Sequence, residues 1–348
     1  MALVEEAVIT LNAGENVGSS CVLDPSNTTL YVGLSTTPPQ VVKINTNTFT
    51  RVGAISLSTP PASSSNSAEI TSAEGFVYIG TGLSPDPAAV KKVDLSTFLE
   101  TASLNLNGVN SLASDIDLTN NILYMSSASA LDRIPLDSFT IATTASTAQP
   151  HSIAGDFSNN LIYTTLVGFG PSTIVDKRNA TTLSLIASIT YPTTGTNPDA
   201  MVIDTVAQKL YIGNGGDQVL TRIDLASFLV DGTLSLGVGT GVGSGCLVID
   251  QENDFLYIKA IGASSSLIAV RLSTFIIDNT LTLSSGGTPN ESGLAGDFTA
   301  QILYTSGSES PAKVIKVSTG VSIIQSWHER LASFSGDGED EEIYGWLD

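Results

Sequence analysis

Aspartate is the residue whose spacing in this chain most resembles a chemical site. Six aspartates stand at one repeated position, seven residues before a tyrosine, and Thr71 replaces the aspartate in one further copy: Asp24, Asp117, Asp156, Asp204, Asp250 and Asp297. Carboxylates that converge can bind a cation or act as general acid and base. The intervening text, such as PSNTT and LTNNI, is however typical of tight turns, in which aspartate accepts hydrogen bonds from backbone amides. We therefore predict a structural turn in each copy.

Other catalytic signals are weak. The chain has only two histidines, His151 and His328, and no Walker, HExxH, GxSxG or CxxC motif. The glycine-rich stretch at 237–245 joins two predicted strands without a following helix, so we expect a connection rather than a phosphate loop. We predict no catalytic residue, no metal, no cofactor and no enzyme activity. A lactonase-like hydrolase is the catalytic alternative, and it needs carboxylates, histidines or a metal gathered around a central channel.

The tyrosines that follow these aspartates mark a repeat that organises the chain. Seven of the nine tyrosines fall at this position, 39 to 48 residues apart: Tyr31, Tyr78, Tyr124, Tyr163, Tyr211, Tyr257 and Tyr304. Each copy contains four strand-like segments separated by Gly/Ser/Pro-rich loops or tight turns such as LSTF. Four strands per repeat of this length indicate a propeller. We predict an all-β fold, a single seven-bladed β-propeller of four-stranded antiparallel blades over residues 1–330.

The segments LYVGLSTTPPQVVKI and LYIGNGGDQVLTRID resemble the YVTN-type β-propeller family, with an apolar-Tyr-Val pattern, a turn and a third strand rich in Val and Ile. The resemblance covers about residues 20 to 327. It implies a seven-bladed propeller.

The third strand of each repeat carries one basic residue. Together these residues are half of the positive charge: Lys43, Lys92, Arg133, Lys177, Arg222 and Lys316, with Arg271 displaced by two positions. We expect them to pair with the acidic repeat positions or to lie on solvated strand edges, a structural role rather than ligand binding.

The N-terminal segment matches the passage from a fourth strand to the next first strand, so residues 4–11 should form the outer strand that closes the last blade. The segment VSIIQSW at 321–327 is a second candidate for this position. If both segments pair with the last blade, that blade has five strands. Cys21 and Cys246 fall in non-adjacent repeats, and we expect two buried free thiols rather than a disulfide.

A net charge of −20, from 14 basic and 34 acidic side chains, opposes binding to nucleic acid and anionic membranes. No basic residue precedes Lys43, whereas a signal peptide needs a positive start, and no run of 18 apolar residues occurs. We expect neither a signal peptide nor a transmembrane segment. Virion or cytoplasm is the predicted location, with a non-classically exported extracellular protein as the alternative.

Residues 331–348 have no counterpart in the repeats. Positions 337 to 342 are nearly all acidic, and Ile343, Tyr344, Trp346 and Leu347 follow. One interpretation is a solvated tail. The other is a docking peptide, because aromatic residues beyond a charged spacer can anchor an interface with a protein partner or neighbouring subunit.

Together these features predict a non-enzymatic structural or binding propeller that mediates protein–protein interaction, such as a component of a virus or phage particle or another large assembly. The alternative is a cell-surface adhesin or carbohydrate-binding propeller. The predicted loops on one face of this propeller contain few aromatic residues on which a glycan could stack. Phe169 and Tyr191 are the exceptions.

Overall fold

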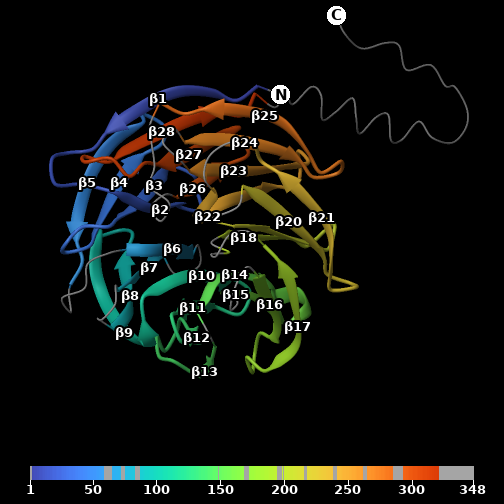
Figure 1. Cartoon of the computed structure of the whole chain (residues 1–348). Coiled ribbons are helices and arrows are strands. Elements are labelled where there is room, and N and C mark those ends of the chain that lie inside the picture. Colours follow the sequence, from blue (N-terminus) through green and yellow to red (C-terminus); the bar gives the residue numbers. More distant parts are fainter. Residues whose placement is uncertain are drawn as a thin grey trace, which may run out of the picture.

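The structure is a ring of seven four-stranded antiparallel sheets, which confirms the predicted fold (Figure 1). It is a computed structural model that describes residues 2–58, 65–71, 75–82, 87–147, 149–167, 172–193, 198, 200–214, 218–237, 241–261, 265–284 and 293–320, without the side chains of 65–71, 167 and 243–245. Within these residues the one helical element is a 3-10 turn, η1 (Phe157–Asn159). None of the helical structure there is long and apolar enough to cross a membrane.

Each blade runs from an inner strand to an outer strand in chain order, except the last. Blades 1 to 3 contain β2 (Gly18–Leu23), β3 (Thr29–Leu34), β4 (Gln40–Asn45) and β5 (Thr50–Ser56), then β6 (Ser65–Thr71), β7 (Phe76–Thr81), β8 (Pro87–Asp94) and β9 (Leu99–Val109), then β10 (Ser111–Asp117), β11 (Ile122–Ser127), β12 (Ala130–Pro135) and β13 (Thr143–Ser146). Blades 4 and 5 contain β14 (Pro150–Asp156), β15 (Leu161–Val167), β16 (Ser172–Asn179) and β17 (Leu185–Pro192), then β18 (Ala200–Asp204), β19 (Lys209–Gly213), β20 (Val219–Asp224) and β21 (Leu229–Ser235). Blades 6 and 7 contain β22 (Gly241–Asp250), β23 (Phe255–Ile261), β24 (Ser266–Arg271) and β25 (Ile276–Thr282), then β26 (Leu294–Asp297), β27 (Ile302–Ser306), β28 (Lys313–Ser318) and β1 (Val4–Thr10).

The N-terminal strand closes the ring, as the sequence predicts. β1 pairs antiparallel with β28 from Val4 opposite Ser318 to Thr10 opposite Lys313, and it is the outer strand of blade 7 (Figure 1). Leu3 and Leu11, at its two ends, are buried in separate core clusters. The second candidate for this position, residues 321–327, lies outside the described residues.

The prediction for the glycine-rich stretch at 237–245 was wrong in part. β22 begins at Gly241, so the second half of this stretch belongs to the inner strand of blade 6. The register of β22 against β23 shifts between Val242 and Leu247. A bulge of this kind adds residues to one strand without ending its pairing, which explains why the stretch resembles a loop in sequence.

The repeat tyrosines form the contacts between neighbouring blades. All seven are at most 3% exposed, and five of them contact the phenylalanine in the turn between the third and fourth strands of the next blade. The ring centroids of these five pairs lie 5.8 to 6.1 Å apart: Tyr31–Phe98, Tyr78–Phe139, Tyr163–Phe228, Tyr211–Phe275 and Tyr304–Phe49. Offset or tilted ring pairs at this distance stabilise beyond the area that they bury.

Blades 4 and 7 provide this phenylalanine from a different turn. Phe157 and Phe298 directly follow the repeat aspartate, and their rings lie 5.3 and 6.2 Å from those of Tyr124 and Tyr257. A Cβ atom on Gly155 would lie 2.0 Å from the Phe157 ring, and one on Gly296 would lie 2.4 Å from Phe298. The shared Gly-Asp-Phe sequence of these two blades therefore makes room for its own aromatic ring.

Carboxylates on the third or outer strand of one blade accept hydrogen bonds from backbone amides near the end of the outer strand of the previous blade. Glu100 of blade 2 accepts a hydrogen bond from the backbone amide of Ser58, which follows the outer strand of blade 1. In the same way Asp132 accepts from the amide of Asn107 at 2.9 Å, and Glu5 accepts from the amide of Ser284 at 2.9 Å. Part of the acidic excess is thus used to hold blades together.

Candidate functional site

The repeat aspartates have the predicted turn role. Asp204 Oδ1 accepts from the backbone amides of Val206 at 3.0 Å and Ala207 at 2.9 Å, and Asp117 Oδ1 accepts from Thr119 and Asn120 at 3.0 Å. The carboxylates of the other four repeat aspartates accept hydrogen bonds from backbone or side-chain donors of their own turns. These four are Asp24, Asp156, Asp250 and Asp297. Across the described part of the chain, no three His, Cys, Asp or Glu side chains form a group that could hold a metal.

Several of the recurring basic residues lie over aromatic rings, a contact that sequence reasoning missed. Lys92 Nζ lies 4.0 Å from the centroid of Phe76, and the guanidinium carbons of Arg222 and Arg271 lie 4.4 and 4.7 Å from Phe275 and Phe255. Arg222 and Arg271 also form ion pairs, but with Asp231 at 2.8 Å and Asp278 at 3.2 Å, which are not the repeat aspartates predicted as partners. The structural role of these cations is therefore both cation–π contact and ion pairing. The signal in the sequence was the phenylalanine of the turn between the third and fourth strands, such as Phe275, or the one that begins the second strand, such as Phe76 and Phe255.

Among the described carboxylates, Asp115 on the inner strand β10 is the one whose pKa is raised most. Its Oδ1 accepts from the amide of Ile116 at 2.7 Å, and its Oδ2 accepts from the amide of Gly155 in β14 at 2.6 Å, so it joins blades 3 and 4. Burial raises the pKa of Asp115 to about 7; the two amide bonds oppose this rise, and the nearby Asp117 charge adds to it.

This environment predicts a pH-dependent stability. Because the pKa of Asp115 is higher in the folded than in the unfolded chain, its ionisation should reduce the free energy of unfolding as pH rises from about 4 to about 7. Asp115→Asn should remove this dependence, so that its stability relative to the wild type rises by about 1 to 3 kcal/mol between pH 4 and pH 8. The cost of turning the NH2 group toward one of the two backbone amides is the same at each pH. Chemical denaturation between pH 4 and 8 measures both effects. Asp137→Asn, at an exposed turn of the same blade, is the control. Equal pH profiles for Asp115→Asn and the wild type would contradict the assignment.

The two cysteines form no disulfide, as predicted, and lie in blades 1 and 6, but Cys21 is half-buried and not buried as predicted. Cys246 is fully buried, and Cys21 Sγ donates to the carbonyl of Tyr304 at 3.6 Å. Burial raises the pKa of Cys21 to about 12 and lowers that of Lys259, which donates to the carbonyl of Ser306. A thiol with so high a pKa is almost entirely protonated and therefore a weak nucleophile, so Cys21 does not form a reactive thiol site.

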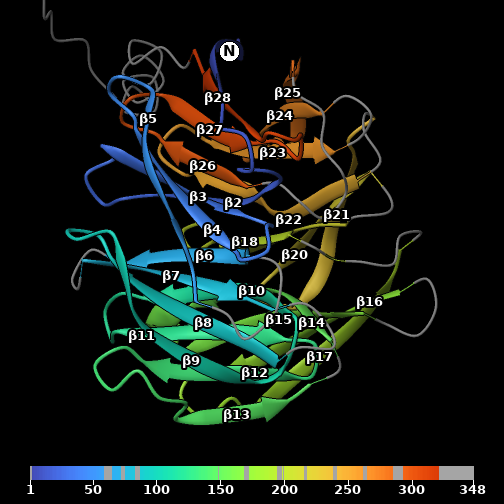
Figure 2. The same ribbon diagram turned by 90° about the vertical axis from the view of Figure 1, so that its left-hand side faces the viewer.

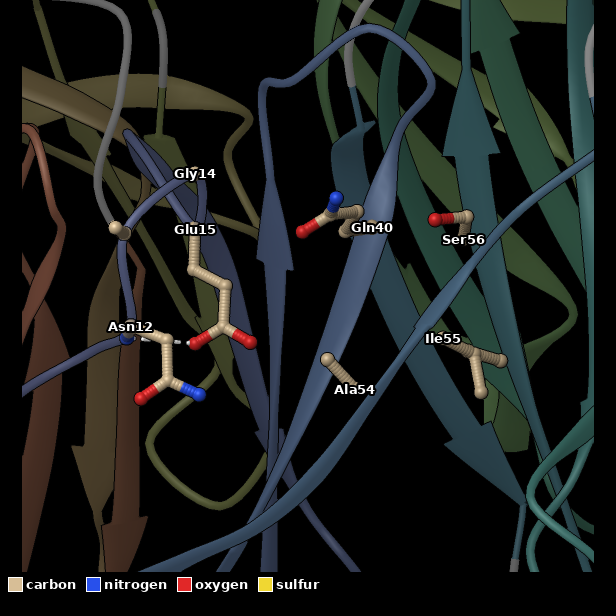
Figure 3. A pocket seen from close by; sticks show the side chains of 8 residues that line it. Asn12, Gly14, Glu15, Gln40, Ala54, Ile55 and Ser56 are labelled. Carbon is tan, nitrogen blue, oxygen red and sulfur yellow. Dashed lines mark hydrogen bonds between the residues drawn. The ribbon is translucent and has the colours of Figure 1, made fainter.

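A polar pocket of about 300 Å³ lies where the ring closes (Figure 3). One wall is the connection from β1 to β2, with Asn12, Ala13, Gly14 and Glu15. The other wall is the outer half of blade 1, with Gln40 at the start of β4 and Ala54, Ile55 and Ser56 at the end of β5. Figure 3 shows the side chains of Asn12 and Glu15 on one side and those of Gln40 and Ser56 on the other.

Glu15 holds the first wall in place. It is 6% exposed, accepts from the amide of Asn12 at 2.9 Å, and forms a bidentate ion pair with Arg51, whose Nε lies 3.0 and 2.9 Å from the two carboxylate oxygens. The hydrogen bonds of Glu15 raise the pKa of Arg51. Bidentate pairs of this kind fix geometry as well as charge. Glu15 also accepts the amide of Ala312 at its backbone carbonyl, at 2.8 Å, so blade 7, the connection and blade 1 meet here.

Of the binding residues predicted from sequence, Tyr191 lies within the described residues, and it does not line this pocket. Tyr191, at the end of β17, is only 7% exposed and packs in the core cluster with Tyr163 and Leu210, which leaves little of its ring for a ligand. Phe169 lies outside the described residues, as do Ile343, Tyr344, Trp346 and Leu347. The pocket residues form no sequence motif, because they come from three separated segments.

Comparisons with known proteins establish the fold alone. No protein-family model matches the chain, and neither does any curated protein. Among 1566 matching solved chains is one titled "Kuenenia stuttgartiensis Hydrazine Synthase", with a TM-score of 0.74 and 13% sequence identity over 90% of this chain and 98% of that chain. A fold shared so widely hosts many unrelated functions. The chain is a seven-bladed β-propeller similar in fold to this protein.

Proposed function

We propose that this protein is a non-enzymatic docking module of a larger assembly, such as a virus or phage particle, and that residues 343–347 bind a protein partner. The observation that carries this proposal is the pattern of the last 18 residues, in which an acidic run precedes Ile343, Tyr344, Trp346 and Leu347. Burial of two aromatic rings and two aliphatic side chains contributes several kcal/mol at about 25 cal/mol per Å², before ordering costs.

The partner is a different protein with a basic surface. An acidic spacer steers its peptide toward positive charge. The propeller is a poor receptor for it, because each Lys and Arg side chain of the described residues already contacts an acid, an aromatic ring or an oxygen of the same chain. The proposal that the protein is not an enzyme is supported by its use of polar side chains for turns and for contacts between blades.

We also propose that the chain is related to the YVTN-type propellers, on the basis of its sequence pattern.

Removal of residues 335–348 tests the docking role. The truncated protein should unfold at the same temperature as the full chain, because these residues follow the last described strand, β28, in the sequence. Its incorporation into native particles should nevertheless fall at least tenfold, which corresponds to about 1.4 kcal/mol. Quantitative mass spectrometry of purified particles measures the loss. Tyr344→Ala with Trp346→Ala should reproduce it, and Phe334→Ala, before the acidic run, should not. Full incorporation of the truncated protein, or a large loss of its stability, would refute this role.

A further inference from the structure

We propose that the pocket between the β1–β2 connection and blade 1 binds one ring of a neutral sugar. It lies in the crevice between blades 7 and 1, since Ala54 on its floor packs in the same core cluster as Ala312 and Val314 of blade 7. All residues that line the pocket lie between positions 12 and 56. The inference is therefore independent of the proposed docking by the C-terminal segment.

The hydrogen-bonding groups of the pocket are available for a ligand. The side-chain amides of Asn12 and Gln40 and the hydroxyl of Ser56 make no hydrogen bond to the described residues of the chain. Asn12 and Ser56 are exposed and Gln40 is half-buried, so solvent reaches all three. A side-chain amide donates and accepts hydrogen bonds, and a hydroxyl can also donate or accept one. This mixed set matches the hydroxyl groups of a sugar, which also donate and accept.

The charge of the pocket favours a neutral ligand. Glu15 is the only ionisable side chain in the lining, and Arg51 neutralises it through a bidentate ion pair. A phosphate or carboxylate ligand would meet this carboxylate with no cationic side chain in the lining to receive it. A cationic ligand would find the carboxylate oxygens already paired. Neutral groups avoid both costs.

The size and floor of the pocket indicate a single ring. A cavity of about 300 Å³ lies at the lower end of the range for small-molecule sites. Ala54 gives it a small apolar floor between the polar walls, on which the C–H face of a pyranose can rest, whereas the side chain of Ile55 packs on the opposite face of blade 1. The site has no aromatic platform, so the expected affinity is low, with a Kd of about 1 mM.

Titration of the full chain with single sugars tests the proposal. The panel consists of glucose, galactose, mannose and N-acetylglucosamine, with glucuronate and glucosamine as charged analogues of the same ring. Saturation-transfer NMR detects contact, and calorimetry gives the Kd. Ser56→Tyr places a ring in the pocket from an exposed strand end and should weaken binding at least tenfold. Ser235→Tyr is the matched control, because Ser235 occupies the same exposed strand end in blade 5.

Binding of at least one neutral sugar that is lost in Ser56→Tyr and kept in Ser235→Tyr supports the proposal. Should Ser56→Tyr not fold, Gln40→Ala and Asn12→Ala serve instead, with an expected loss of at least threefold each. The proposal is overturned if no neutral sugar binds, if the charged analogues bind equally well, or if both tyrosine variants behave alike. None of these results depends on residues 335–348, so the docking role stands or fails separately.

Discussion

Removal of residues 2–11 should lower the thermal midpoint of the propeller by roughly 10 °C or more. This segment supplies the outer strand of blade 7, buries Leu3 and Leu11, and places Glu5 on the amide of Ser284 in blade 6. Each buried leucine contributes about 1.5 to 3 kcal/mol, and the lost strand pairing adds to this. The truncated ring would end in the open edge of β28. Differential scanning calorimetry measures the change.

A pair of point variants separates ring closure from mere truncation. Ile9, on the half-buried face of β1, packs against the cluster that joins blades 7 and 1, whereas Val8 is 40% exposed on the opposite face. Ile9→Asp should destabilise by about 3 kcal/mol because it buries a charge in an apolar contact. Val8→Asp should change stability by less than about 0.5 kcal/mol. Equal effects of the two substitutions would show that β1 does not pack with this face inward.

Tyr257→Ala should cost about 3 to 5 kcal/mol, because it removes a fully buried ring from the contact between blades 6 and 7. The ring lies 5.9 Å from Phe255 and 6.2 Å from Phe298, so its loss leaves two aromatic partners beside a cavity. Chemical denaturation gives the change in the free energy of unfolding.

Tyr257→Phe is the conservative control for this site. It keeps the ring and removes only the hydroxyl, and its cost should stay near 1 kcal/mol. Tyr344→Ala, in the C-terminal segment, should leave stability unchanged. If Tyr257→Ala unfolds at the wild-type denaturant concentration, the tyrosine repeat does not hold the blades together.

The blade count and strand order could be predicted because each repeat carries its own local signals. Asp204 fixes a turn within three residues, and the strand after it begins at Lys209, two residues before the repeat tyrosine, so period and turn chemistry suffice. The closing strand at 4–10 was also predictable, since it resembles the fourth strand of other repeats. Features that depend on contacts between blades were not. Phe298 replaces the turn phenylalanine of blade 7 from a different turn, and the Gly-Asp-Phe sequence that marks this exchange gains its meaning only from the contact with Tyr257 of the neighbouring blade.

The pocket at the closure could not be predicted for the same reason. Gln40 and Ser56 are paired across β4 and β5. Asn12 lines the same pocket because Glu15, in the connection from β1 to β2, pairs with Arg51 of blade 1. A sequence of 40 residues separates Arg51 from the end of β1, and nothing in it marks this ion pair. The glycine-rich stretch at 241–245 was misassigned because a bulged inner strand and a loop share the same composition.

Closure by β1 also sets an order of events during protein synthesis. The ribosome makes β1 first, yet its partner β28 emerges only after about 300 further residues. At 5 to 20 residues per second, the strand waits for roughly 15 to 60 s with its backbone groups unpaired. Throughout that time the nascent chain carries a free edge that can join another copy. Glu5 and Glu6, on adjacent positions of this strand, place negative charge on the waiting edge and oppose such misassembly.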